Sequence, residues 1–473
     1  MKPRTATAVI GANFGDEGKG LAVDAIVARD PDAAVIRFNG GAQAGHTVVA
    51  EDGRRHVFSH FGAGTLRGAA TFLSRFFVVQ PSIFAREAVE LAGIGVKPAV
   101  FVDPDAQVTT PFDVLINQWV EETRGRSRHG SVGVGFGETI ERFELGYGLA
   151  VRDLGDDEAI TQILTRIRDV WLPIRLARLG VPFTAQREDT AANPAVVRRY
   201  LAQIHVLRRS ASPAPIDAVL ARKNIVFEGA QGLLLDMDRG LKFPHVTRSN
   251  TGLRNVLALA TDARIERLDV VYMTRAYLTR HGAGPVPNEV PKLAFADVDD
   301  PTNLPNPWQG TLRFAPLDLD VLCTTIADDL SDAATSDIEV DPGIGVTCVD
   351  HIRSGADVFR SGVESTIPVP RLASEIAVAA GLPLVLEAHG PLRSAVELTS
   401  RNTRHRIGRQ PSRGAAYDMR ASFPSGWARS REGSCREFLS VDQAPPKPPR
   451  PSEGGDRRWC SYLSPALYPN AGR

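Results

Sequence analysis

Short apolar runs alternate with segments of helical spacing along most of the chain. Runs that predict buried strands end at Ile10 and occupy residues 34–38, 77–79, 99–102 and 225–227. Apolar positions three and four residues apart predict helices that start near Leu21 and cover residues 82–92, 157–179 (kinked or broken at Pro173) and 194–209. Strand and helix patterns that alternate in this way predict an α/β fold.

The first strand pattern continues directly into a loop that is rich in glycine. Gly11, Gly15, Gly18 and Gly20 precede the first helical segment. Glycines let backbone N–H groups close on an anion, and a helix N-terminus adds partial positive charge. The spacing is not that of a P-loop, which requires G-x-x-x-x-G-K-[ST]. The pattern predicts a phosphate site, and the alternative is a tight turn with a solvated Asp–Glu–Lys surface.

Two side chains of this loop have chemistry that suits a phosphoryl site. Lys19 brings a mobile positive charge, whereas Asp16 would be repelled by phosphates unless it binds Mg²⁺ or accepts a substrate proton. A second glycine loop, residues 40–45, follows the strand pattern 34–38 and leads to His46. Ligands of open α/β sheets collect at the carboxyl ends of strands, so both loops could face one crevice. Asp16 would then be a base and His46 an acid or phosphate ligand; the alternative for His46 is a packing residue.

Two later stretches also carry candidate ligand-binding residues, one in a glycine run and one directly after a strand pattern. Residues 124–141 join a basic cluster to a further glycine run, for which a flexible surface loop is the alternative interpretation. Gln231 follows the strand pattern 225–227. Its amide offers a donor and an acceptor that suit the edge of a purine with a 6-oxygen, although a capping role is the simpler interpretation.

Composition narrows the class of protein. The 473 residues are 43% hydrophobic and 23% charged with zero formal net charge, so nothing favours bulk attraction to nucleic acid or membrane. The four cysteines lie far apart without a C-x-x-C pair, which favours a reducing cytoplasm over a disulfide scaffold or zinc site. No stretch of 18 apolar residues occurs, so we expect no membrane span.

Several separated motifs, in order, resemble those of adenylosuccinate synthetases. They are GDEGKG at 15–20, RFNGGAQAGHT at 37–47, GSVGVGFG at 130–137, FEGAQGLLLDMD at 227–238, FPHVTRSNT at 243–251 and RAYLTRHGAGPVPNE at 275–289, with VTCVD at 346–350 and GPLR at 390–393 as weaker matches. The resemblance covers roughly residues 7–395. It implies a large central, mainly parallel sheet flanked by helices in a single large domain, and a homodimer. We therefore expect a catalytic domain over residues 1–398 and a basic, Pro-, Arg- and Ser-rich extension over residues 399–473 that is disordered.

The resemblance also implies a reaction. A base removes the N1 proton of a 6-oxopurine nucleotide, the 6-oxygen attacks the γ-phosphate of GTP or ATP, and the amino group of L-aspartate displaces the 6-phosphoryl group. By resemblance Asp16 is the base and a Mg²⁺ ligand, His46 is the acid, Gln231 stabilises the 6-oxyanion, and the Gly45 backbone offers Mg²⁺ an oxygen. The nucleotide- and phosphate-binding residues that it implies are Gly15, Glu17, Gly18, Lys19, Gly20, Gln43, Ser131, Thr247, Asp350 and Gly390, and the aspartate-binding residues are Thr311 and Arg313.

Five positions depart from the family pattern. Gln43 stands where the family has Asn, Val132 has lost a hydroxyl, and Tyr147 replaces an arginine that reaches the partner subunit's nucleotide. Arg313 is the single arginine in a segment that is usually rich in arginine, which weakens the case for aspartate. Cys348 replaces the lysine that lies along the guanine of GTP.

These departures leave alternatives open. IMP is the expected acceptor because Asp16 is retained, and dGMP, giving 2-amino-deoxyadenylosuccinate, is the alternative. The donor is GTP or ATP. An alternative of another class is a purine-nucleotide-binding protein without catalysis. In each case the partners are small molecules, with no nucleic acid and no membrane.

Overall fold

The computed structural model describes residues 4–239, 245–298, 300, 303 and 309–399, all within one compact unit. The predicted extension 399–473 therefore lies outside the described residues, apart from Thr399. The strands are β1 Thr5–Gly11, β2 Ala33–Arg37, β3 His46–Val49, β4 Arg55–Phe58, β5 Ala70–Leu73, β6 Val100–Val102, β7 Ser212–Pro213, β8 Asn224–Glu228, β9 Arg267–Arg275, β10 Leu278–Arg280, β11 Arg313–Ala315, β12 Leu317–Asp318, β13 Glu339–Thr347, β14 Gly355–Arg360, β15 Val363–Pro368, β16 Leu384–Ala388 and β17 Val396–Leu398.

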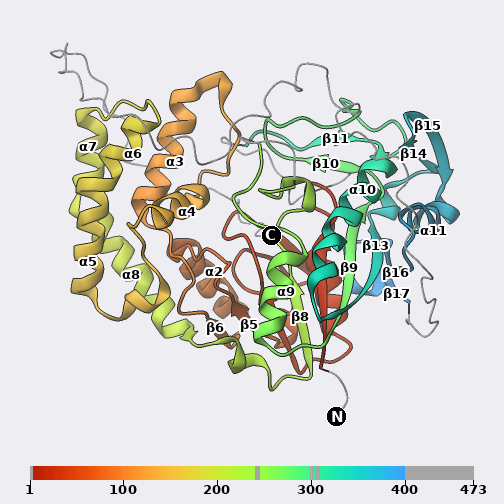
Figure 1. The fold of residues 1–473 in the computed structure, drawn as a ribbon, viewed down its shortest axis with the longest axis horizontal. Coiled ribbons are helices and arrows are strands. Elements are labelled where there is room, and N and C mark those ends of the chain that lie inside the picture. Colours follow the sequence, from red (N-terminus) through yellow and green to blue (C-terminus); the bar gives the residue numbers. More distant parts are fainter. Residues whose placement is uncertain (1–3, 240–244, 299, 301–302, 304–308, 400–473) are drawn as a thin grey trace. The chain divides into compact units, whose positions relative to one another are not determined.

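The helices are interspersed with these strands, except that α3 to α8 follow one another without an intervening strand (Figure 1). They are α1 Lys19–Val27, α2 Pro81–Gly93, α3 Pro111–Arg124, α4 Phe136–Glu144, α5 Asp157–Arg166, α6 Leu172–Arg178, α7 Ala185–Ala192, α8 Pro194–Ser210, α9 Leu253–Asp262, α10 Leu319–Leu330 and α11 Val369–Ala380. Among the described residues, no helix has the length and apolar character needed to cross a bilayer.

One 10-stranded sheet organises this unit. Its strand order is β17-β16-β13-β9-β1-β8-β2-β5-β6-β7, and all neighbours pair in parallel except β16 and β17. Strand β1 lies between β9 and β8, with Val9 aligned to Val271 on one side and to Glu228 on the other. The expected large, mainly parallel sheet is confirmed. Small sheets of β3–β4, β10–β11 and β12–β14–β15 flank it.

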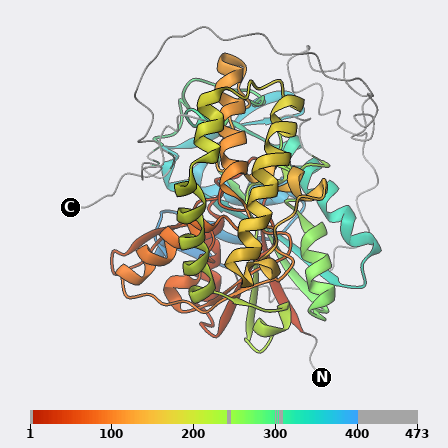
Figure 2. The same ribbon diagram turned by 90° about the vertical axis from the view of Figure 1, so that its left-hand side faces the viewer.

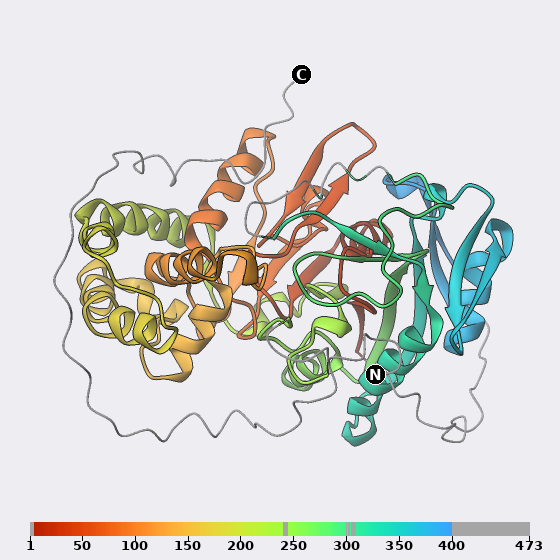
Figure 3. The same ribbon diagram turned by 90° about the horizontal axis from the view of Figure 1, so that it is seen from above.

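Helices cover both faces of the sheet, and each face has its own apolar core. Alternate strand residues divide between the cores: Ala8 and Ile10 pack on one face, and Val9 on the other. Helices α9, α10 and α11 supply one core, and α1, α2, α3, α5, α6 and α8 supply the other. Figures 1 to 3 place α3 to α8 beside the β6 edge, and β14, β15 and α11 at the opposite end. Burial on both faces explains why the strands are continuous apolar runs in the sequence.

Two expected elements differ in detail. Residues 77–79 form no strand, because Val78 and Val79 each make only one isolated bridge, to Gly41 and Val108. The helix expected over 157–179 is interrupted by a wide turn at Ile167–Trp171, just before Pro173 in α6. Proline lacks an N–H and clashes with the carbonyl four residues earlier, which accounts for a break at this place.

A buried carboxylate fixes the chain after β4 to helix α2. Glu87 accepts hydrogen bonds from the backbone N–H groups of Ser59 (3.0 Å), His60 (2.8 Å) and Phe61 (3.3 Å). The imidazoles of His56 and His60 lie 3.6 and 3.7 Å from its oxygens. Burial raises the pKa of Glu87, but the nearby imidazoles of His56 and His60 and the backbone N–H donors outweigh burial and lower it to about 2.

Replacing Glu87 with Gln should therefore destabilise the fold by a few kcal/mol at neutral pH. Because the folded pKa is lower than the unfolded one, the stabilisation by Glu87 is complete above about pH 4.5 and is lost as the pH falls toward 2. Urea unfolding of wild type and E87Q at several pH values measures this, and the difference between them should shrink below pH 4.5. A difference that is constant with pH would contradict the assignment.

Candidate active site

Five neighbouring parallel strands end at one edge of the sheet, and almost every predicted catalytic residue follows one of them. The strands are β13, β9, β1, β8 and β2 in spatial order. Asp16 follows β1, Gln231 follows β8, and the loop 39–45 that leads to His46 follows β2. Because β8 lies between β1 and β2, the structure brings the loops that carry these three residues together.

The first glycine loop is closed by its own carboxylate. Glu17 is buried and accepts from the backbone N–H groups of Asn13 (2.6 Å) and Gly15 (3.3 Å). Lys19, at the start of α1, is 3% exposed, and its Nζ lies 3.1 Å from Glu17 Oε2. The loop packs tightly on β13: Gly18 has φ +75°, and a Cβ there would lie 2.8 Å from Thr347. Burial raises the pKa of Glu17, and Lys19 and the backbone donors offset this only in part.

This arrangement changes the interpretation of Lys19. The sequence predicted a mobile charge for a phosphate, whereas the structure places the ammonium group in a buried ion pair with Glu17. The roles of Lys19, Glu17, Gly15, Gly18 and Gly20 toward a phosphate remain predictions. A phosphate in this loop would compete with Glu17 for the same N–H donors.

His46 is held by a carboxylate to which the sequence argument gave no role. Its Nδ1 makes a short hydrogen bond with Glu228, the last residue of β8, which also accepts from the Ala63 N–H at 3.0 Å. Burial lowers the pKa of His46, and the negative charge of Glu228 offsets this only in part. For Glu228, burial raises the pKa, but Arg37 and His46 outweigh burial, so the pKa of Glu228 is lowered. The ionised carboxylate only accepts hydrogen bonds, so Nδ1 carries the proton and Nε2 is the nitrogen left for a ligand. The sequence offered one indication of this role, because Glu228 is an acidic residue at the end of an apolar strand pattern.

Two glutamine amides lie beside the same loops with buried atoms that lack partners. A Cβ on Gly40 would lie 3.3 Å from Gln231 Oε1 and 3.8 Å from Gln43 Nε2, and one on Gly15 would lie 3.5 Å from the Gln231 Cα. Gln231 Oε1 and both amide atoms of Gln43 are buried without a hydrogen-bond partner among the described residues. Unsatisfied buried amides are costly, so their presence here favours a ligand that completes them.

Strained backbone is found at the same strand ends. Asp16, Gln231 and Cys348 each have φ of 58°, in the left-handed region, and they follow β1, β8 and β13. Non-glycine residues adopt this conformation at a cost of about 1 kcal/mol, and such residues cluster at functional sites.

In the predicted aspartate-binding segment, the guanidinium of Arg313 already contacts other groups of the protein. Arg313 donates from Nε to Glu289 Oε1 at 2.7 Å and makes a second, shorter contact with Oε2. Its Nη1 donates to the carbonyls of Gly282 (2.8 Å) and Gly284 (2.5 Å). Thr311 is exposed. A substrate carboxylate that binds Arg313 must therefore displace Glu289, and both aspartate-binding roles remain predictions.

A buried arginine supports the corner next to this segment. Arg280 donates to the carbonyls of Pro285 and His245, each at 2.8 Å, and lies 4.5 Å from the Phe14 ring centroid. Burial and the charge of Arg313 lower its pKa to about 9. This corner packs against Gly130 of the 130–137 loop, where a Cβ would lie 2.9 Å from the Gly282 Cα.

The other predicted residues lie farther from these contacts. Ser131 accepts from Asn117 Nδ2 at 2.8 Å, which ties its loop to α3. Tyr147 packs against Trp171 and Arg166 of the helical region, so it faces a packed core here. The remaining residues are Thr247, whose N–H donates to Leu235, Asp350, which is exposed after β13, and Gly390, which follows β16; their binding roles stay predictions.

Four residues around Asp16 were missed by the sequence argument. Arg275, His281, Asp300 and Asn303 form a hydrogen-bonded chain that contacts Asp16 at both ends. The sequence offered one indication of their importance, because Arg275 and His281 stand where the motif of the resembling family has Lys and Val.

The donor atoms at this edge suit Mg²⁺ only in part. The predicted ligands, the Asp16 carboxylate and the Gly45 backbone carbonyl, are hard oxygens of the kind that Mg²⁺ prefers. Among the described residues, no group of three or more His, Cys, Asp and Glu side chains could hold a metal. This fits an ion bound through one or two protein oxygens and completed by phosphates and water, and does not fit a site made of protein ligands alone.

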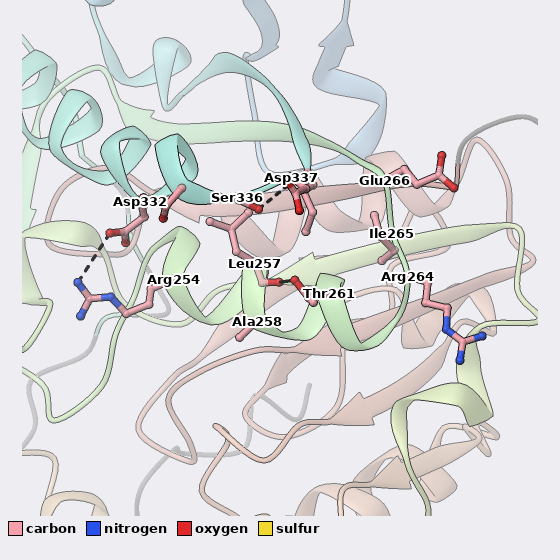
Figure 4. A pocket seen from close by; sticks show the side chains of 12 residues that line it. Arg254, Leu257, Ala258, Thr261, Arg264, Ile265, Glu266, Asp332, Ser336 and Asp337 are labelled. Carbon is pink, nitrogen blue, oxygen red and sulfur yellow. Dashed lines mark hydrogen bonds and ion pairs between the residues drawn. The ribbon is translucent and has the colours of Figure 1, made fainter.

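A separate cavity of about 640 Å³ lies between α9 and residues 332–338 (Figure 4). It borders Arg264, Ile265 and Glu266, which directly precede β9, so it lies at the amino end of that strand. None of the predicted site residues lines it. Ligands of parallel sheets bind at the other edge, and we do not assign the reaction to this cavity.

The fold and the strand-end loops define an α/β protein with a mainly parallel sheet and a candidate ligand site at the carboxyl ends of its strands. Residues 8–301 match the family model of adenylosuccinate synthetase, and the chain belongs to the adenylosuccinate synthetase family. The resemblance seen in the motifs is thus confirmed for this part of the chain, whereas Thr311, Arg313, Asp350 and Gly390 lie beyond the matched residues.

Individual relatives agree with the family assignment. The chain is 32% identical over 295 residues to an adenylosuccinate synthetase of Paraburkholderia phytofirmans, covering 61% of this chain and 64% of that protein. It is 32% identical over 295 residues to one of Pseudomonas fluorescens, covering 60% and 64%. The chain thus spans less than two thirds of these relatives. A solved structure of fully ligated adenylosuccinate synthetase from Plasmodium falciparum superposes with a TM-score of 0.66 at 17% identity, covering 84% of this chain and all of that one, which supports the fold.

Replacing Glu228 with Gln should lower the pKa of His46 further, by about one unit or more. The amide keeps the acceptor for Ala63 but removes the negative charge that favours the imidazolium. Histidine-selective NMR titration measures this, with H46N to identify the resonance. Glu144→Gln is the control, since that carboxylate pairs with Arg248, and it should leave the pKa of His46 unchanged. An unchanged or higher pKa of His46 in E228Q would contradict the coupling.

Proposed function

We propose that this protein joins L-aspartate to C6 of a 6-oxopurine nucleotide, with IMP as acceptor and adenylosuccinate as product. The observation that carries the proposal is the convergence of Asp16, the His46–Glu228 pair and Gln231 at the carboxyl ends of three adjacent strands. The family membership of residues 8–301 supports it.

Each group has a role that its surroundings favour. Asp16, whose carboxylate is 26% exposed, takes the proton from N1 of the purine. Gln231 donates an amide N–H to the 6-oxygen as negative charge develops there. His46 is oriented through Nδ1 by Glu228, and as the imidazolium, which the negative charge of Glu228 favours, it donates from Nε2 to the phosphoryl group in transfer. The 6-phosphate then leaves when the amino group of aspartate attacks C6.

The proposal includes the small molecules that this reaction needs. The phosphoryl donor is GTP or ATP. Cys348 stands where the family has the lysine that lies along the guanine of GTP, so both donors are tested. Mg²⁺, when bound, neutralises phosphate charge during transfer. We further propose a cytoplasmic homodimer, as the resemblance implies.

The direct test is an assay of the purified protein with Mg²⁺, L-aspartate, GTP or ATP, and IMP or dGMP. The expected result is adenylosuccinate formed from IMP and aspartate. Product from dGMP alone would replace the acceptor with the alternative, and no product from any combination would favour a protein that binds nucleotides without catalysis.

Asp16→Asn should reduce turnover by at least about 100-fold while the substrates still bind. The amide has a similar shape but cannot accept the N1 proton. Steady-state kinetics and calorimetric titration with IMP measure the two properties separately. Near-normal turnover of D16N would remove the proposed base.

Arg313→Leu should raise the KM for aspartate by about 10-fold or more, because a guanidinium is the strongest partner for a carboxylate. Glu289→Gln should lower that KM by a few fold, since Glu289 competes for the same guanidinium. The two variants form a matched pair with opposite expected signs. If both leave the KM for aspartate unchanged, Arg313 does not bind aspartate.

A further inference from the structure

A chain of hydrogen bonds starts at the Asp16 backbone carbonyl and returns to within ion-pair distance of the Asp16 carboxylate. Four residues from two stretches of the sequence form it. Arg275 Nε donates to the Asp16 backbone carbonyl, and Arg275 Nη2 donates to Asp300 Oδ2 at 3.0 Å. Asn303 Nδ2 donates to the same Asp300 oxygen at 2.7 Å, and Asn303 Oδ1 lies 3.0 Å from His281 Nε2. That nitrogen lies 3.5 Å from Asp16 Oδ2, which closes the ring.

The chemistry of the ring fixes which nitrogen of His281 carries the proton. Burial raises the pKa of Asp300, but Arg275 and Asn303 outweigh it and lower the pKa, so Asp300 is a carboxylate that only accepts. The Asn303 amide must therefore point its NH₂ at Asp300 and its oxygen at His281. An amide oxygen only accepts, so His281 Nε2 is the protonated nitrogen in the neutral ring.

The single N–H at Nε2 of His281 has two acceptors within reach, the Asn303 amide oxygen at 3.0 Å and Asp16 Oδ2 at 3.5 Å. Among the described residues, it is the only side chain that makes a hydrogen-bond or ion-pair contact with the Asp16 carboxylate. The other ring nitrogen, Nδ1, is buried without a hydrogen-bond partner in the same part of the chain. Oδ2 of Asp16 thus faces the His281 N–H, which leaves Oδ1 as the oxygen that can reach a ligand.

We propose that His281 is a positioning residue, whose Nε2–H, shared between Asn303 Oδ1 and Asp16 Oδ2, holds the Asp16 carboxylate in the geometry that proton removal requires. The inference rests on the proposed role of Asp16 as base. Asp16 has a strained backbone with φ of 58°, and the ring fixes it at two points, the carbonyl through Arg275 and the carboxylate through His281. A partly exposed aspartate without such contacts would sample several side-chain rotamers.

The ring joins Asp16 to residues of two other stretches of the chain. Arg275 ends strand β9, and Asp300 and Asn303 are the other described members beside His281. Displacement of Asn303 would release the His281 ring and with it the Asp16 carboxylate. The position of the base is thus coupled to Asn303.

The test compares four variants with wild type by kcat and KM for each substrate. His281→Val removes the N–H and should lower kcat by about 10- to 100-fold, with each KM within about threefold, because a misplaced base slows the chemical step more than binding. His281→Gln retains an N–H of similar reach and should recover most of kcat. Asn303→Leu should lower kcat as His281→Val does, and the double variant should be no worse than either single one.

Asp297→Asn is the matched control. Asp297 lies three residues before Asp300 in the sequence and pairs with the exposed Arg353 instead of a member of the ring. The kcat of D297N should therefore equal that of wild type. The positioning role is wrong if H281V keeps kcat within twofold of wild type, if H281Q falls as far as H281V, or if the loss is entirely in KM.

Crystal structures of wild type and H281V test the same claim without activity. The Asp16 carboxylate should occupy one position in wild type and several in H281V, whereas one shared position in both proteins would overturn the proposal. If wild type turns over no substrate, the proposed function fails, and the crystallographic result still decides whether His281 positions Asp16.

Discussion

The parallel pairing of β8 with β1 on one side and β2 on the other is the constraint on which the site depends. It brings the loops after three strands to one edge, although Asp16 and Gln231 in these loops are 215 positions apart in the chain. The pairing is secured by apolar side chains that are buried on both faces. Buried parallel strands cannot shift by one residue without reversing which side chains face each core, so the placement of the loops is rigid.

Glu228 connects this scaffold to the chemistry. It is the last residue of β8, fully buried, and it holds both the imidazole of His46 and the N–H of Ala63. Burying a carboxylate is costly unless nearby positive charge and donors compensate, and Arg37 and His46 provide that compensation. The site therefore has an oriented imidazole at the junction of β8 and β3 before any ligand binds.

Much of the fold could be predicted because its signals are local. The runs that became β1, β2 and β8 have apolar centres, and the helix after Leu21 and the break near Pro173 follow from spacing and from the geometry of proline. Asp16, His46 and Gln231 could be singled out because each follows a strand and a glycine. The order of strands in the sheet could not be read from these patterns and came from the resemblance only as a general architecture.

The contacts of the site could not be predicted, because they join residues that are distant in sequence. Nothing in GDEGKG indicates that Glu17 turns inward to satisfy Asn13 and Gly15, leaving Lys19 in a buried pair. The pairing of Arg313 with Glu289 depends on the antiparallel bridge between their neighbours Phe314 and Val290, and the ring around Asp16 depends on three separate segments.

The most direct test of the central claim uses IMP with heavy oxygen at C6, in the presence of aspartate and nucleoside triphosphate. The account predicts that the heavy oxygen appears in the released inorganic phosphate; adenylosuccinate formed with unlabelled phosphate would contradict it.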